Sequence, residues 1–287
     1  MARLSAVLLA AAVLVNAAPS LLPRQTISTL STAQISVFKP YTYYAAAAYC
    51  DPAKTLAWNC GPNCQANQGF QTVASGGDGS GTQFWYVGYD ATLQSIIVAH
   101  QGTDPSEILA WATDAEFVLD GLNSTLFPGI SSSIEVHSGF ADEQAKTAAD
   151  VLAAVKTAIS KFGSNQVTIV GHSMGAALSL LDSVYLPLHL PGVSFKSILY
   201  ALPRVGNQAF ADYASTGNTV THINNMEDPV PTIPGRFLGF HHPTGEIHIQ
   251  DSGAWESCPG QDNDDDRCIV GDVPNIFDGD VSDHDGP

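Results

Sequence analysis

Residues 165–187 read Asn-Gln-Val-Thr-Ile-Val-Gly-His-Ser-Met-Gly-Ala-Ala-Leu-Ser-Leu-Leu-Asp-Ser-Val-Tyr-Leu-Pro. The uncharged, largely β-branched run at 167–170 is typical of a central strand that is covered on both faces. The run at 176–186 suits a helix, which Pro187 is expected to end. The stretch therefore predicts a strand that turns sharply into a helix, with Gly-x-Ser-x-Gly at the turn.

Ser173 occupies the middle of that turn. A strand that reverses into a helix holds its middle residue in a strained conformation, and flanking glycines let the neighbouring backbone pass without Cβ clashes. Such a turn lifts the serine hydroxyl above the sheet edge, over the N-terminus of the helix. We interpret Ser173 as a catalytic nucleophile, and the simpler alternative is an ordinary Gly/Ser turn.

The order of the other predicted elements is that of an α/β protein with a mostly parallel central sheet flanked by helices. A helix over 33–49 re-starts at Pro40, and a long amphipathic helix over 141–162 ends at Gly163, directly before the central strand. The other predicted strands are 84–89 and 95–100, joined as a hairpin, then 197–201, 219–224 and, at an edge of the sheet, 246–250.

The composition limits the classes of partner. The chain has 287 residues, of which 45% are hydrophobic and 14% are charged, so a single domain with a large core is expected. Its net charge of −17 argues against binding to nucleic acid or to anionic membrane surfaces. Substrates are therefore expected to be neutral or weakly charged.

The N-terminus has the pattern of a secretory signal. Residues 1–17 combine Arg3, an apolar run at 6–15 that is too short to span a bilayer, and a small residue, Ala17, at the expected cleavage point. The mature protein is expected to be extracellular, without an integral membrane segment. Residues 18–25 are either a short pro-segment or a tail, and 26–287 is the expected hydrolase domain.

Five cysteines in a secreted chain imply disulfides. Closeness in sequence suggests Cys60 with Cys64 and Cys258 with Cys268, which leaves Cys50 as a free thiol or as a competitor for one of these partners. The sequon at Asn123 predicts a surface glycan. The acidic run at 262–266 lacks the pattern of a calcium loop, so it is read as a solvated loop and no metal is expected.

A serine nucleophile needs a histidine to accept its proton and a carboxylate to orient that histidine. After this type of turn the chain order is Ser, Asp, His, which restricts the search to residues beyond Ser173. Asp228 follows the predicted strand at 219–224, in a loop fixed by two prolines, and strand ends are where α/β proteins collect site residues. For the base, His241, His242 and His248 suit structural or surface roles. His284 remains, and the alternative for a histidine in such a polar C-terminal tail is that it takes no part in the site.

Four ordered motifs resemble those of the secreted class 3 lipases of filamentous fungi, a family that also contains feruloyl esterases. The likeness extends from about residue 32 to the C-terminus. The motifs are Gly-His-Ser-Met-Gly at 171–175, His-Ser-Gly-Phe at 137–140, Leu-Pro-Arg-Val-Gly-Asn-Gln-Ala-Phe-Ala at 202–211 and Asp-Pro-Val-Pro at 228–231.

This resemblance implies an α/β-hydrolase fold with a helical lid and no cofactor. It implies Ser173 as nucleophile, Asp228 as acid and His284 as base, since the family's histidine lies near the end of the chain. The sequence departs from the family pattern at two points. No aromatic pair follows His284 before Pro287, and Gln101 stands where the family often has arginine.

Attack on an ester creates an alkoxide that must be stabilised by hydrogen-bond donors. The residue after the nucleophile supplies one backbone N–H, here that of Met174. The resemblance places the second donor at Thr103, after the early strand. The alternative is that Thr103 merely ends that strand.

The segment after Thr103 has the pattern of an amphipathic helix that starts at the Asp104 cap. The apolar side is formed by residues that include Ile108, Leu109 and Trp111. We interpret this helix as a lid over the site, and the alternative is a fixed core helix.

Together these features predict a secreted, monomeric triacylglycerol lipase that acts on acylglycerols at an oil–water interface, through an acyl-enzyme and with a lid that gates the site. The close alternative is a feruloyl or general carboxylesterase that acts on soluble esters. An alternative of another class is a catalytically silent lipid-binding protein of the same fold, which the ordered triad disfavours.

Overall fold

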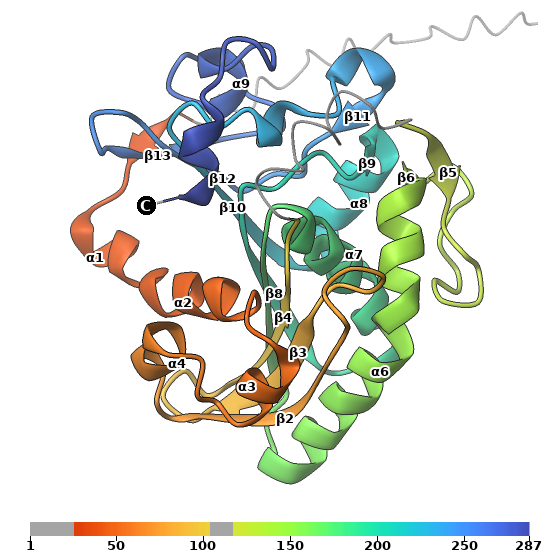
Figure 1. The fold of residues 1–287 in the computed structure, drawn as a ribbon. Coiled ribbons are helices and arrows are strands. Elements are labelled where there is room, and N and C mark those ends of the chain that lie inside the picture. The colour runs from red at the N-terminus through yellow and green to blue at the C-terminus, as the bar shows by residue number, and fades with distance from the viewer. Residues whose placement is uncertain (1–25, 104–116, 287) are drawn as a thin grey trace, which may run out of the picture.

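The computed structural model describes residues 26–103 and 117–286 (Figure 1). The predicted signal peptide, residues 1–17, and the segment 18–25 lie outside the described residues. No helix among those described combines the length and the apolar run that crossing a bilayer requires.

A nine-stranded sheet runs through the described part of the chain. The third to the seventh strands in its order are parallel, and two antiparallel strands flank them on each side. The predicted α/β-hydrolase type of fold is confirmed, with a mixed sheet that is parallel at its centre and antiparallel at both ends. The strand order is β1 (Ser28–Thr29), β13 (Trp255–Cys258), β12 (Glu246–Ile249), β10 (Thr219–Asn225), β8 (Ser194–Tyr200), β7 (Gln166–His172), β4 (Ser95–His100), β3 (Trp85–Asp90) and β2 (Phe70–Gly76).

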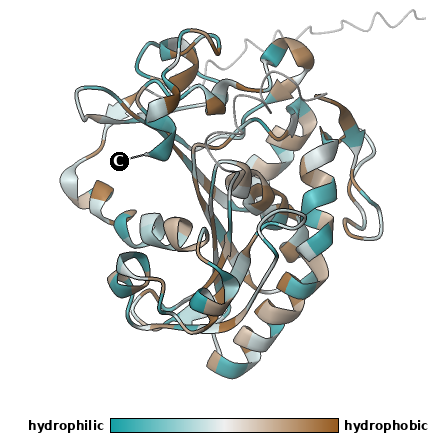
Figure 2. Cartoon of the chain, in the orientation of Figure 1, coloured by the Kyte–Doolittle hydropathy of each residue, from teal (hydrophilic) through white to brown (hydrophobic). Residues whose placement is uncertain are grey.

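Both faces of this sheet are covered by helices, which explains its uncharged central strands. Successive side chains of β4 lie on opposite faces of the sheet. Ile97 packs in one hydrophobic cluster, and Val98 packs in the other. The cluster around Val98 is covered by α6 (Ser138–Phe162) and α7 (Met174–His189), and the other by α2 (Lys39–Ala47). Hydrophobic and hydrophilic residues alternate along α6 in Figure 2, as the predicted amphipathic pattern requires.

Shorter elements complete the described structure. A second, four-stranded sheet lies beside the top of α6 in Figure 1. Its strands are β5 (Leu119–Gly121), β6 (Glu135–His137), β9 (Gly206–Asn207) and β11 (Phe240–His241). The remaining helices are α1 (Thr32–Ser36), α3 (Pro52–Leu56), α4 (Pro62–Ala66), α8 (Gln208–Gly217), α9 (Ile269–Asp272), η1 (Val230–Thr232), η2 (Arg236–Leu238) and η3 (Val281–Asp285).

The prediction that Pro187 ends its helix is wrong, because α7 continues to His189. Proline has no N–H to donate to the carbonyl four residues earlier, which is that of Ser183. The side-chain amide of Asn218 donates to that carbonyl instead. The helix therefore passes through Pro187 without leaving a buried acceptor unsatisfied.

The prediction that 246–250 forms a sheet edge is also wrong. β12 lies inside the sheet, with β10 parallel on one side and β13 antiparallel on the other. Three strands of this sheet were not predicted from the sequence. β13 and β1 extend the sheet beyond β12, and β2 lies at the opposite end.

The two predicted disulfides are present in the structure. Cys60 pairs with Cys64 at a Cα–Cα distance of 5.2 Å, and Cys258 pairs with Cys268 at 5.9 Å. Cys50 is a free, partly buried thiol whose pKa is raised by burial.

Candidate active site

Ser173 stands at the predicted sharp turn between β7 and α7, as the N-cap of the helix. Its backbone has φ 58° and ψ −130°, a region that L-residues seldom adopt. Glycine is required on both sides, because a Cβ on Gly171 would lie 2.2 Å from the carbonyl oxygen of Gly175. A Cβ on Gly175 would lie 2.3 Å from the carbonyl oxygen of His100. Local steric constraint therefore holds Ser173 at the start of the helix.

Asp228 and His284 are 56 residues apart in the chain and meet as a buried pair. Asp228 lies in the loop after β10, and its Oδ2 is 2.9 Å from His284 Nδ1. Its other oxygen, Oδ1, accepts a hydrogen bond of 2.9 Å from the N–H of Val230, which fixes the carboxylate. Nδ1–H therefore donates to Asp228, and Nε2 is the nitrogen of His284 that can accept a proton.

His284 also lies next to the nucleophile's turn. Its ring centroid is 4.5 Å from that of His172, the residue before Ser173. Within the described structure, Nε2 of His284 is buried and has no hydrogen-bond partner. A buried, unpartnered imidazole nitrogen beside a strained serine is chemically suited to accept a proton there.

His172 and Tyr49 hold the segment that carries His284, a function that the sequence analysis missed. Nε2–H of His172 donates to the backbone carbonyl of His284 at 2.7 Å, and the Tyr49 hydroxyl donates to Nδ1 at 2.7 Å. Burial, and then the proximity of His284, lower the pKa of His172 to about 4. His172 is therefore neutral near pH 7. This agrees with its hydrogen bonds, because a neutral imidazole has one nitrogen that donates, here Nε2, and one that accepts, here Nδ1. The only sequence signal was its place in Gly-His-Ser.

The two predicted oxyanion-hole residues lie side by side. The Thr103 hydroxyl is 3.5 Å from Sδ of Met174, which is the first residue of α7. First-turn amides of a helix have no acceptor within the helix, so the Met174 N–H is available in principle to an oxyanion. The chain before Thr103 also touches the turn, because a Cβ on Gly102 would lie 3.0 Å from Cβ of Ser173.

Other predicted residues have different outcomes. Ile108, Leu109 and Trp111 of the predicted lid lie outside the described residues. Asn123 is exposed just after β5, and its glycosylation stays a prediction. Asp182 is buried in α7 and contacts His100 Nε2 at 2.8 Å, away from the triad.

One group of side chains in the described structure has the spacing of metal ligands. One ligand atom from each of Glu246, Cys258 and Cys268 lies within 4.8 Å of the others. The two sulfurs are bonded to each other, however, so neither is present as a thiolate that could bind a metal ion.

Residues 97–238 match the family described as Lipase (class 3). The chain is 32% identical over 225 residues to the secreted mono- and diacylglycerol lipase MDL4 of Malassezia globosa, covering 72% of this chain and 71% of that protein. It is 34% identical over 179 residues to MDL2 of the same organism, covering 61% of this chain but only 59% of that protein.

The fold is similar to that of solved fungal lipases. The triacylglyceride lipase of Rhizomucor miehei superposes with a TM-score of 0.78 at 27% identity, over 90% of this chain and 96% of that one. The described structure and this neighbour therefore share their architecture along nearly their whole length.

Proposed function

This chain belongs to the class 3 lipase family, and from that premise we propose that it is a secreted lipase that hydrolyses acylglycerol esters, triacylglycerols included. The observation that carries the proposal is the buried Asp228–His284 pair beside the strained turn of Ser173. The names of the relatives, secreted mono- and diacylglycerol lipases, support the location and the class of substrate.

In the proposed reaction, Ser173 Oγ attacks the ester carbonyl while His284 Nε2 takes its proton. Asp228 keeps the imidazole in the tautomer with Nδ1–H and stabilises it once it is protonated. The N–H of Met174 and the hydroxyl of Thr103 are the proposed donors to the alkoxide. His284 then protonates the leaving alcohol, and water, activated by the same nitrogen, releases the carboxylic acid from the acyl-enzyme.

The proposal also includes direct contact between the protein and a lipid surface. Phe237 and Phe277 are each 90% exposed and line one depression of about 500 Å³. Phe117, which follows the predicted lid segment, and Thr232, in the loop of Asp228, line it too. Rings so exposed are stabilised when an apolar phase covers them, and the net charge of −17 favours a neutral phase over an anionic one.

The decisive experiment measures hydrolysis of a triacylglycerol through its solubility limit, with a soluble short-chain ester alongside. We expect both esters to be cleaved, with a steep rise in triacylglycerol turnover once droplets form. Ser173→Ala should leave at most the ~10³–10⁴-fold enhancement over water that binding and an oxyanion hole can support. A protein that cleaves soluble aryl esters but no emulsified acylglycerol would instead be an esterase of the feruloyl or general type.

A second experiment tests the lipid contact. Phe237→Ser with Phe277→Ser should weaken adsorption to neutral droplets by roughly tenfold or more, because burying one phenylalanine side chain contributes about 1.5–3 kcal/mol. Hydrolysis of the soluble ester should not change. Leu56→Ser is the matched control, since Leu56 is 55% exposed on α3 and does not line that depression. Unchanged adsorption of the double variant would exclude this surface as the contact.

A further inference from the structure

The loop that carries Asp228 supplies donors to only some of its own backbone carbonyls. The N–H groups of Thr232 and Ile233 donate to the carbonyls of Pro229 and Val230, and the carbonyls of 231–234 receive no such bond from within the loop. Residues 229–234 contain three prolines, Pro229, Pro231 and Pro234, none of which has an N–H. The backbone carbonyls of these prolines and of the residues between them need hydrogen-bond donors wherever they are buried. The loop is therefore held in place by groups from elsewhere in the chain.

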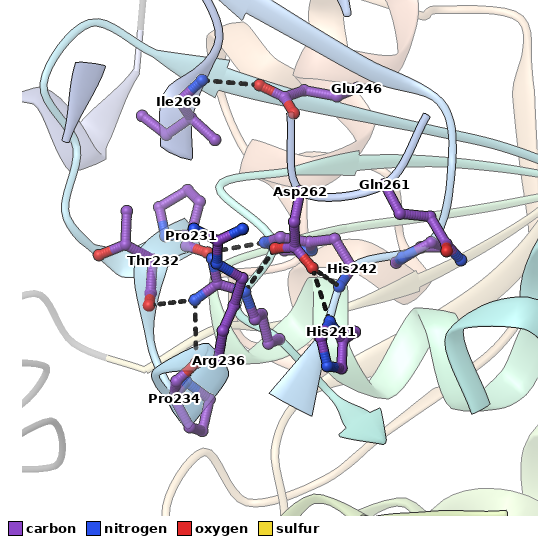
Figure 3. A network of polar contacts seen from close by, with 12 residues as sticks. Pro231, Thr232, Pro234, Arg236, His241, His242, Glu246, Gln261, Asp262 and Ile269 are labelled. Atoms are coloured by element: carbon purple, nitrogen blue, oxygen red, sulfur yellow. Dashed lines mark hydrogen bonds and ion pairs between the residues drawn. The ribbon is translucent and has the colours of Figure 1, made fainter. Parts of the chain in front are cut away.

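Arg204 and His242 supply those donors to four consecutive carbonyls, of which those of Pro231, Thr232 and Pro234 belong to residues labelled in Figure 3. His242 Nε2–H donates to Pro231 at 2.7 Å, and the Arg204 guanidinium donates to Thr232 and, at 3.0 Å, to Pro234. The backbone N–H of Arg204 donates to the carbonyl of Ile233 at 2.9 Å.

Asp262 fixes both donors. Its Oδ1 accepts from Arg204 Nε at 2.7 Å, and its Oδ2 accepts from the backbone N–H of His242 at 3.1 Å (Figure 3). Arg204, Asp262 and His242 are all buried, so the ion pair is hardly screened by water. Asp262 has φ 47°, a left-handed conformation that aspartate and asparagine tolerate better than most residues.

His242 is neutral in this arrangement. Burial lowers its pKa to about 4, although the nearby Asp262 carboxylate opposes that effect. A neutral imidazole has one N–H, and the contact with Pro231 requires that it be on Nε2. The loop is thus bound by one fixed cation and one neutral donor, both of which are held by the same carboxylate.

We propose that Arg204, Asp262 and His242 are positioning residues for the reaction, because they fix the loop that presents Asp228 to His284. This inference rests on the proposed function. It gives a function to the Arg204 in the 202–211 motif, which the triad and oxyanion hole leave unexplained. Arginine suits this position because its planar fork reaches Asp262 and two carbonyls together, whereas a lysine ammonium presents a single point of charge.

The test is the kinetics of Arg204→Lys on a soluble ester. We expect kcat to fall by about 10- to 100-fold with KM within about twofold, because small displacements of catalytic groups have effects of that size. Arg267→Lys is the matched control, since Arg267 pairs with Asp265 at the exposed surface, and it should leave both constants unchanged. A folded Arg204→Lys protein with the kcat of the wild type would overturn the proposal.

A double-mutant cycle separates positioning from general stability. If Arg204 acts through Asp228, then Arg204→Lys should lower kcat little further in a background that already carries Asp228→Asn. A full, additive loss in that background would overturn the proposal, because Arg204 would then act elsewhere.

Arg204→Lys can fail to fold, because it weakens the pairing of a buried carboxylate. In that case Arg204→Met with Asp262→Asn removes both charges and should fold more readily, while kcat stays low. A folded double variant with normal kcat would refute the inference. Wild-type protein without esterase activity would overturn the proposed function, and this inference with it.

Discussion

Glu246 allows a prediction about how stability depends on pH. Its carboxyl group is buried in β12, where Oε1 accepts a hydrogen bond of 2.7 Å from the N–H of Ile269 (Figure 3). Burial raises its pKa from 4.5 to about 8, and Asp262 adds to the increase, while Ile269 and Arg204 oppose it. Folded protein at pH 6–7 therefore carries this group protonated, and the unfolded chain carries it ionised.

The sign and the size of the effect follow from this difference. Between pH 4.5 and 8 the folded state holds a proton that the unfolded state has released, so the free energy of unfolding falls as pH rises. The contribution is fully present below pH 4.5 and is lost as pH rises to about 8. That interval is about 3.5 pH units, and at about 1.4 kcal/mol per unit the upper bound is about 5 kcal/mol.

Glu246→Gln removes the titration while keeping the shape of the side chain and its acceptor for Ile269. Unfolding by urea should be measured for both proteins at pH 5, 6, 7 and 8, at constant ionic strength and with disulfides intact. The stability of the variant relative to the wild type should increase by about 1 kcal/mol per pH unit across this range. Groups that both proteins share cancel in the comparison. A stability difference that does not change between pH 5 and pH 8 would refute the reasoning.

Three further predictions concern stability and gating. Cys258→Ser should lower the free energy of unfolding by roughly 3 kcal/mol, because its disulfide closes a loop of ten residues; urea unfolding that leaves the midpoint unchanged would contradict this. Asn218→Ala should cost about 1–3 kcal/mol by leaving the Ser183 carbonyl in α7 without its donor, whereas Asn218→Asp, which offers no donor at neutral pH, should be no better. Ile108→Ser with Trp111→Ser should flatten the rise in triacylglycerol turnover at droplet formation without affecting a soluble ester, and an unchanged rise would exclude the lid.

The local features of this protein were readable from its sequence. The turn at Ser173 follows from steric limits on adjacent residues, since only glycine fits at 171 and 175. The long helix α6 follows from apolar residues at helical spacing, and Gly163 at its end has the expected left-handed φ of 67°. Such signals depend on neighbours within a few residues, so no knowledge of the chain's path is needed.

The resemblance to a known family supplied what local patterns lacked. Residue type and order restricted the acid to candidates after Ser173, but a histidine in a polar C-terminal stretch had no local mark of function. His284 was selected only through the position that the family's histidine takes. The contact with Asp228 then depends on how η3 packs against the loop after β10, over a separation of 56 residues.

Tertiary structure alone decided the remaining features. The helix α7 tolerates Pro187 because Asn218, 31 positions later in the sequence, donates a hydrogen bond to the Ser183 carbonyl that proline cannot serve. β12 is interior because β13 and β1 return to pair beyond it. Arg204, which Asp262 holds in place, binds the loop of Asp228 because segments that are far apart in the sequence come together in the folded chain. Hydrophobic periodicity and secondary-structure propensity describe only the local conformation that a residue prefers, given its neighbours in the sequence. Partners of buried polar groups are instead fixed by which distant segments the folded chain brings together.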